Sequence, residues 1–149
     1  MRGRRSLEVV VDTSFLLPTL GVDVEEEVYD AIRLFRRVEV FYLEVSLLEA
    51  LWKLARLGVD PGRIALGVDA IRRTYRLLTP GPEAFSEALE LYRLGHRDLV
   101  DDLLYAAASS TGRPLLTVDR AFIDFLREAG RDASVAVTPR RFADLLGRR

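Results

Sequence analysis

The chain has 149 residues, with 22 basic and 23 acidic side chains, one histidine and no cysteine. This length suits a single compact domain, and we expect residues 1–149 to form it. The lack of cysteine excludes disulfides, thiolate catalysis and thiolate zinc sites. A net charge of −1 argues against a general basic coat for nucleic acid. No apolar run approaches the ~18–20 residues of a membrane span, so we expect a cytoplasmic protein without a signal peptide.

Strand-like and helical patterns alternate along the first half of the chain. Residues 7–11 form a β-branched run that ends at Asp12, which predicts a buried strand. Acids in the first turn and arginines in the last turn predict a helix over about 25–37. We then expect a strand over 38–43, a helix over 46–57, a helix that begins at Asp60-Pro61, and a strand over 75–79.

The second half continues this alternation. Apolar residues from Phe85 to Tyr92 have helical spacing and are followed by Gly95. We next expect a helix over 98–110, a strand over 115–118, a helix with an apolar stripe from Phe122 to Ala129, a strand over 134–137 and a tail helix begun by Thr138-Pro139. This order predicts an α/β fold, a three-layer α/β/α sandwich with a central, mostly parallel sheet of four or five strands.

Two patterns in the predicted helix 46–57 bear on its orientation. Ser46 and Glu49 have the spacing of a capping box, and Glu49 precedes Lys53, the only lysine, by one turn. The residues that recur on one apolar face are Leu48, Leu51, Trp52 and Ala55. We predict that this face is buried.

Four acids are predicted to lie at one edge of the sheet. Asp12 and Asp119 follow strands, and sites in open parallel sheets form beyond the carboxyl ends of the strands. Glu49 and Asp101 each stand in the first turn of a predicted helix. If these helices begin at the same edge, four carboxylates converge, which is unfavourable without a cation because nearby like charges cannot all stay ionised. An oxygen-only set of ligands favours Mg²⁺ or Mn²⁺.

Each of these acids also has a structural explanation. Asp12 could close a turn, Glu49 could pair with the lysine one turn on, and Asp119 could cap the helix that follows it. Asp98 suits a helix N-cap, which leaves Asp101 as a first-turn acid favoured by the helix dipole. The shared edge and the order of the four acids, rather than any one of them, favour a metal site.

The same residues carry a family resemblance that spans almost the whole chain. Asp12 at the end of the first strand, followed by Thr13 and Ser14, resembles the opening motif of PIN domains. The other segments that resemble this family are Ser46–Leu51, Asp98–Ala108, Leu115–Phe122 with its Thr-x-Asp-x-x-Phe pattern, and Thr138–Phe142. Their spacing is close to that of VapC-type toxins, the nuclease members of toxin–antitoxin pairs.

The third motif departs from the family pattern because it is crowded with acids. Asp98 stands where the family often has Ser or Thr, and Asp102 stands where a small residue is common. We assign the metal-site role to Asp101, since this choice leaves Gly112 and Thr117 at their expected offsets. Asp102 is the alternative, and Asp98 is an accessory acid.

The resemblance implies a metal-dependent endoribonuclease that hydrolyses RNA phosphodiester bonds, the toxin of a toxin–antitoxin pair, with an antitoxin protein as partner. Its catalytic and metal-binding residues would be Asp12, Glu49, Asp101 and Asp119, with Mg²⁺ or Mn²⁺ as cofactor. Thr13, Ser14 and Thr117 would be accessory residues that orient the carboxylates or a metal-bound water. The alternatives are a stand-alone RNA-processing nuclease, a non-catalytic module that binds RNA or protein, and a metal phosphatase.

Three further expectations concern the surface. The single histidine, His96, cannot supply a two-histidine ribonuclease site within one protomer, and we expect it to be a surface loop residue. Broad apolar faces on several helices, together with the resemblance, predict a homodimer. The basic side chains that could meet RNA phosphates at the chain ends are Arg2, Arg4, Arg5, Arg140 and Arg141.

Overall fold

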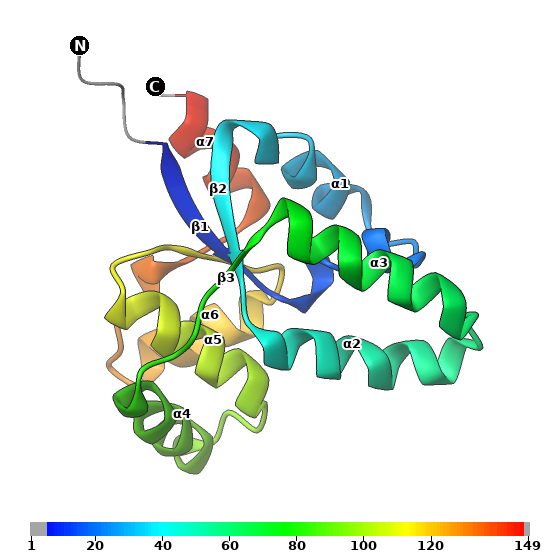
Figure 1. The fold of residues 1–149 in the computed structure, drawn as a ribbon. Coiled ribbons are helices and arrows are strands. Elements are labelled where there is room, and N and C mark those ends of the chain that lie inside the picture. The colour runs from blue at the N-terminus through cyan, green and yellow to red at the C-terminus, as the bar shows by residue number, and fades with distance from the viewer. Residues whose placement is uncertain (1–5, 148–149) are drawn as a thin grey trace.

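Five parallel strands form one sheet in the order β3-β2-β1-β4-β5 (Figure 1). The computed structural model describes residues 6–147, so Arg2, Arg4 and Arg5 lie outside the described residues. The strands are β1 (Leu7–Val11), β2 (Val38–Tyr42), β3 (Arg76–Leu77), β4 (Leu115–Leu116) and β5 (Ala136–Val137). The predicted α/β fold with a mostly parallel sheet is therefore confirmed, and every strand pairing in it is parallel.

The central strand, β1, is an almost continuous run of valines because both faces of the sheet are covered. Successive side chains of a strand point to opposite faces. Val9 and Val11 accordingly pack into one core, and Val10 packs into the other. A parallel sheet buried on both sides needs apolar residues at successive positions, which explains why β1 shows no alternation with polar residues.

Helices cover the sheet in two layers. The core on the Val9 side takes buried residues from α1 (Glu26–Ile32), α2 (Glu44–Leu57), α3 (Pro61–Thr74) and α7 (Pro139–Gly147). The core on the Val10 side takes them from α4 (Pro82–Leu94), α5 (Leu99–Ser110) and α6 (Arg120–Glu128). Short 3-10 turns lie at η1 (Thr13–Phe15), η2 (Pro18–Leu20), η3 (Phe35–Arg37) and η4 (Ala133–Val135). Within residues 6–147, no helix is both long and apolar enough to cross a membrane.

Several element boundaries differ from the sequence predictions. The helix predicted over 25–37 ends at Ile32, and η3 replaces its last turn. In this turn the Phe35 ring packs 5.9–6.2 Å, centroid to centroid, from the rings of three other aromatic residues, Phe15, Tyr75 and Phe142. The strands predicted over 75–79, 115–118 and 134–137 are shorter than expected. In each of them only two residues pair with a neighbouring strand, and these are the residues of β3, β4 and β5.

The capping box predicted at the start of the second helix is not formed. α2 begins at Glu44, two residues before Ser46, because the single buried residue Leu43 connects it directly to β2. Ser46 therefore lies inside the helix. Its hydroxyl is buried and has no hydrogen-bond partner among the described residues.

The buried face of α2 is also not the predicted one. Leu48, Leu51 and Trp52 are 50%, 44% and 63% exposed. The residues that face the core are Ser46, Leu47, Ala50 and Leu54. Apolar side chains occupy two faces of this helix, and the face with the small residues Ser46 and Ala50 is the one that packs into the core.

A close approach between α3 and η2 depends on Gly67. A Cβ atom at this position would lie 2.7 Å from the backbone oxygen of Thr19 and 2.9 Å from Cδ2 of Leu20. We therefore expect Gly67→Ala to destabilise the fold by ~1–3 kcal/mol and to lower the melting temperature by several degrees. Gly62→Ala is the matched control in the same helix, since its Cβ would meet only the Asp60 side chain, at 3.3 Å. Thermal unfolding followed by circular dichroism compares the two variants, and equal melting temperatures would contradict this packing.

Candidate metal centre

The predicted acids stand where the strand order of the sheet reverses. β1 lies between β2 and β4, so the chain builds outward from β1 in both directions. Such a reversal leaves a crevice beyond the carboxyl ends of the two adjacent strands. Asp12 directly follows β1, and its backbone N–H donates to the Leu116 oxygen of β4 at 3.1 Å. Asp119 follows β4 by three residues and is thereby held at the same end of the sheet.

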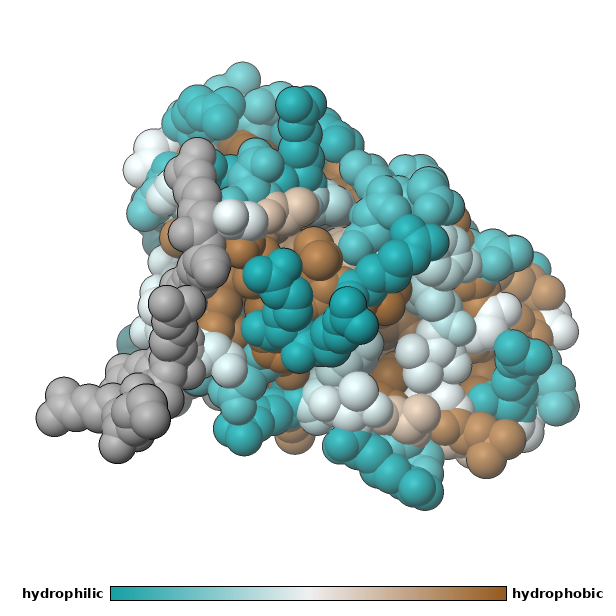
Figure 2. Space-filling model, turned by 90° about the horizontal axis from the view of Figure 1, so that it is seen from above, coloured by the Kyte–Doolittle hydropathy of each residue, from teal (hydrophilic) through white to brown (hydrophobic). Residues whose placement is uncertain are grey.

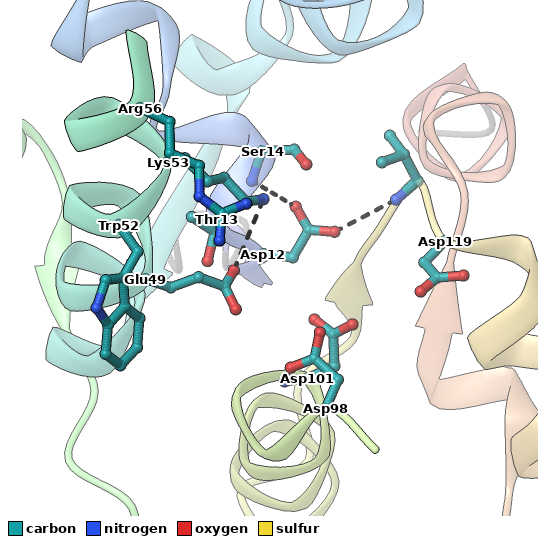
Figure 3. Close-up of a pocket in the computed structure, with 11 residues that line it drawn as sticks. Asp12, Thr13, Ser14, Glu49, Trp52, Lys53, Arg56, Asp98, Asp101 and Asp119 are labelled. Carbon is teal, nitrogen blue, oxygen red and sulfur yellow. Dashed lines mark hydrogen bonds and ion pairs between the residues drawn. The ribbon is translucent and has the colours of Figure 1, made fainter. Parts of the chain in front are cut away.

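A pocket of about 360 Å³ opens at this position (Figure 3). It brings together all four acids predicted for the metal site and three of the predicted accessory residues, Thr13, Ser14 and Asp98. The other two accessory residues, Asp102 and Thr117, do not line it. The full lining is Asp12, Thr13, Ser14, Glu49, Trp52, Lys53, Arg56, Asp98, Asp101, Val118 and Asp119.

Asp12 is buried at the centre of this arrangement. Its carboxylate accepts hydrogen bonds from the backbone N–H groups of Ser14, at 2.9 Å, and Val118, at 3.4 Å. Burial raises the pKa of Asp12 to about 6, although these hydrogen bonds and one from the Thr117 hydroxyl lower it. The turn-closing role considered for Asp12 is therefore present. It leaves lone pairs on both carboxylate oxygens for a further ligand.

Asp101 is the acid most affected by its neighbours. Asp98 caps α5 by accepting from the backbone N–H groups of Val100 and Asp101, both at 3.1 Å, and so fixes the first turn of the helix. Burial raises the pKa of Asp101 to about 8, and the carboxylates of Asp98, Asp12, Glu49 and Asp119 each add to the rise. These five acids thus form one electrostatic cluster, as Figure 3 also shows.

Glu49 and Asp119 complete the cluster from opposite sides. The Glu49 carboxylate lies 3.9 Å from the Lys53 ammonium, so the expected pair is present. Asp119 caps α6 by accepting from the Phe122 N–H at 3.0 Å, while its own N–H donates to the Thr117 hydroxyl at 3.1 Å. Thr117 therefore contacts two of the acids without lining the pocket.

His96 and Asp102 form a part-buried pair that the sequence interpretation missed. His96 lies in a loop, as expected, but its side chain is only 15% exposed, which contradicts the expectation of a surface position. Its Nδ1 lies 2.6 Å from Oδ1 of the fully buried Asp102, and its ring lies 4.3 Å from the Phe122 ring. The sequence did carry one signal of this pair. Asp102 lies on the otherwise apolar side of α5, one turn before Tyr105, and a carboxylate buried there needs a polar partner.

The donor set fits a hydrated divalent cation. One ring nitrogen of His96 and one carboxylate oxygen each of Asp101 and Asp119 lie within 4.8 Å of one another. Thr13 also lines the acid pocket, and its buried hydroxyl has no hydrogen-bond partner among residues 6–147. Such an unsatisfied oxygen is uncommon in a folded protein and is a further oxygen donor at this position. Carboxylate and hydroxyl oxygens suit Mg²⁺ or Mn²⁺, and a nearby imidazole suits Mn²⁺ better than Mg²⁺.

A family model for the PIN domain matches residues 9–127, and the chain therefore belongs to the PIN domain family. A search of curated protein sequences finds no match. The chain is similar to several solved structures. PAE2754 from Pyrobaculum aerophilum is 23% identical with a TM-score of 0.64, and the match covers 99% of this chain and 100% of that one.

Two further structures are similar at lower identity. VapC20 from Mycobacterium tuberculosis, a toxin that cleaves the sarcin–ricin loop, is 21% identical with a TM-score of 0.60, over 84% of this chain and 97% of that one. A toxin–antitoxin complex from Klebsiella pneumoniae is 16% identical with a TM-score of 0.59, over 88% and 97%. These likenesses show that the fold is shared.

Raised carboxyl pKa values make the stability of the metal-free protein depend on pH. Burial raises the pKa of Asp12 and Asp102 to about 6, and burial with repulsion raises that of Asp101 to about 8, from 3.8. The folded state therefore binds protons more tightly than the unfolded chain. The resulting stabilisation is complete below about pH 4 and is lost as the pH rises through about 6 to about 8.

We expect the melting temperature of the chelator-treated protein to fall between about pH 5 and about pH 8. The fall follows because these carboxylates must ionise while buried. Asp101→Asn should flatten the upper part of the fall, which calorimetric melts across this range would show. A profile unchanged by the substitution would mean that the Asp101 carboxyl is not held among like charges.

Proposed function

We propose that this chain is a Mg²⁺- or Mn²⁺-dependent endoribonuclease with Asp12, Glu49, Asp101 and Asp119 as its metal-binding and catalytic acids. The observation that carries the proposal is the convergence of these four acids and Asp98 in one pocket, where burial and the neighbouring carboxylates raise the pKa of Asp101. Such mutual repulsion is offset either by a bound proton or by a cation, and a cation lets all of the acids stay ionised. Membership of the PIN domain family, whose members are typically metal-dependent nucleases, supports the same conclusion.

The chain's own residues have distinct roles in this proposal. The bound ion would activate a water and neutralise the charge that develops on the phosphate, so that no histidine base is needed. Asp12 and Asp101 give up their protons when they bind the ion. The Thr117 hydroxyl holds the Asp119 backbone, and the unpartnered Thr13 hydroxyl orients water in the pocket. Ser14 keeps Asp12 in position through its backbone N–H.

A nuclease toxin that acts with an antitoxin is the biological role we favour. Two of the similar structures are a VapC toxin and a toxin–antitoxin complex, which supports this role without distinguishing it from a stand-alone RNA-processing nuclease. A non-catalytic module that binds RNA or protein does not require four acids in one pocket, where their repulsion is unfavourable. We propose a single nuclease domain over residues 1–149, acting in the cytoplasm.

The exposed apolar side chains of α2 and α3 favour a protein partner. Leu48, Leu51, Leu57 and Leu66 are 44–74% exposed. Figure 2 shows hydrophobic residues gathered at the end of the molecule that the α2–α3 hairpin forms in Figure 1. Apolar surface of this kind, rimmed by polar residues, is typical of a contact with another protein. We propose that it serves a second copy of the chain or an antitoxin.

Metal-dependent cleavage of RNA is the direct consequence of the proposal. The protein should cleave mixed single-stranded RNA in Mg²⁺ or Mn²⁺ and lose this activity in chelator. Asp12→Asn should reduce cleavage roughly 100-fold or more, because it replaces a negatively charged ligand of the ion with a neutral amide. Activity should also fall in Glu49→Gln, Asp101→Asn and Asp119→Asn. Gel analysis of end-labelled RNA measures this, and cleavage that survives thorough chelation would refute the metal mechanism.

The same variants should differ in how strongly Mg²⁺ stabilises them. At about 100 times its dissociation constant a ligand of the folded state adds ~2.7 kcal/mol, or roughly 5–10 °C in melting temperature for this size. Wild type should show this gain and Asp12→Asn should lose most of it. Asp132→Asn is the matched control, since Asp132 also caps a turn but lies outside the pocket. An equal gain in all variants would mean that the acids are not the metal site.

We predict a homodimer that uses the α2 surface. Light scattering at micromolar concentration should give about twice the monomer mass of 16.8 kDa. Leu48→Glu with Leu51→Glu should shift the protein to monomer because it buries two charges at the contact. Leu94→Glu, an exposed leucine of α4 in the opposite layer, is the control and should remain dimeric. A wild type that is monomeric at these concentrations would contradict the prediction.

A further inference from the structure

The helix α2 presents three different faces. An α-helix turns about 100° per residue, so residues three and four apart share a face. Beside the core face, the outer apolar face carries Leu48, Leu51 and Ala55, all exposed. The third face, here called the pocket face, carries Glu49, Trp52, Lys53 and Arg56, and all four residues line the acid pocket.

The pocket face combines an open aromatic ring with two cations. Trp52 is 63% exposed although it lines the pocket, so its indole is free to contact a ligand. Among residues 6–147, the 3.9 Å contact with Glu49 is the one ion pair of Lys53. Arg56 belongs to none of the ion pairs formed by the described residues. Figure 3 shows Lys53 and Arg56 extending from α2 toward the acids, with the Trp52 ring beside Glu49 at the outer edge of the pocket.

An exposed indole beside cations matches the chemistry of single-stranded nucleic acid. Proteins that bind single strands stack bases on aromatic side chains and track the backbone with basic ones. Arginine in particular has the geometry and charge to bind phosphate. From Glu49 to Arg56 the helix rises ~10 Å, the length of about three stacked nucleotides at ~3.4 Å each.

A protein ligand fits the pocket face less well. The outer apolar face already offers leucines without charges, and it lies beside the pocket face rather than within it. A partner that covered Trp52 by hydrophobic contact would also have to desolvate Lys53, Arg56 and the acids, which is unfavourable without matched charges. A strand of RNA supplies both the aromatic base and the negative phosphates.

We propose that Trp52, Lys53 and Arg56 form a subsite for single-stranded RNA beside the acid cluster. The indole stacks on a base, and the two cations contact the phosphates next to it. This inference rests on the proposed function, since the strand so held would lie against the metal-binding acids. It makes Trp52 a determinant of the substrate class, because a base paired within a duplex cannot stack on the indole.

Trp52 is the only tryptophan, so its fluorescence reports on this subsite alone. We expect the emission of the chelator-treated wild type to be quenched by a short single-stranded RNA. An abasic ribose-phosphate oligomer of equal length should bind through its charges without the same quenching. Equal quenching by both oligomers, or quenching by neither, would overturn stacking on Trp52.

Affinity measured with a dye-labelled RNA extends the test to variants. Trp52→Leu should weaken binding roughly 5- to 150-fold, whereas Trp52→Phe, which keeps a ring, should retain most of the affinity. Lys53→Gln with Arg56→Gln should reduce the slope of log K against log salt by about 1.4, or ~0.7 per phosphate contact. Leu94→Ala, at an exposed leucine of α4 outside the pocket, is the control and should bind RNA as the wild type does.

The outcomes separate this inference from the proposed function. RNA cleavage in Mg²⁺ with an affinity unaffected by Trp52→Leu would refute the subsite and leave the nuclease standing. Binding that depends on Trp52 without metal-dependent cleavage would support the subsite and refute the nuclease. If Trp52→Leu left RNA affinity unchanged and instead converted a dimer to monomer, Trp52 would be a protein contact and the inference would fall.

Discussion

The defining constraint of this protein is the repulsion among the carboxylates that lie close together, partly out of water, at the carboxyl ends of β1 and β4. Burial and this repulsion together raise the pKa of Asp101, whereas burial alone raises the pKa of Asp12. A bound proton or a cation relieves this repulsion. A rearrangement of exposed side chains does not, because α2, α5 and the turns after β1 and β4 hold the acids in position. The rest of the fold supplies the rigidity that keeps the acids close.

The structural and chemical roles of these acids coexist. Asp98 and Asp119 cap helices, and Asp12 closes a turn, yet all three line the pocket. A carboxylate has two oxygens with several lone pairs, so a cap uses only part of its capacity. The backbone hydrogen bonds also fix the carboxylates in place before any ion arrives, which reduces the entropy that binding must remove.

Much of the fold and site could be predicted from the sequence, because strand periodicity and acids at strand ends are local signals. The order of strands and helices and the convergence of Asp12 and Asp101 belong to this class. The buried face of α2 could not be predicted, because apolar residues occupy two of its faces and only the tertiary packing that buries Ser46 and Ala50 selects one. The His96–Asp102 pair was missed because it joins a loop to a helix interior, which no periodicity records.

Calorimetric titration with Mn²⁺ in two buffers of different ionisation enthalpy tests the central claim most directly. Ligands must be deprotonated before they bind a metal, so binding to carboxyls with raised pKa values releases protons. Near pH 6.5 the account predicts saturable binding and a heat that differs between the buffers. In Asp101→Asn it predicts weaker binding and a smaller difference. Binding with the same heat in both buffers, or no binding, would contradict the claim that a cation relieves the buried acids.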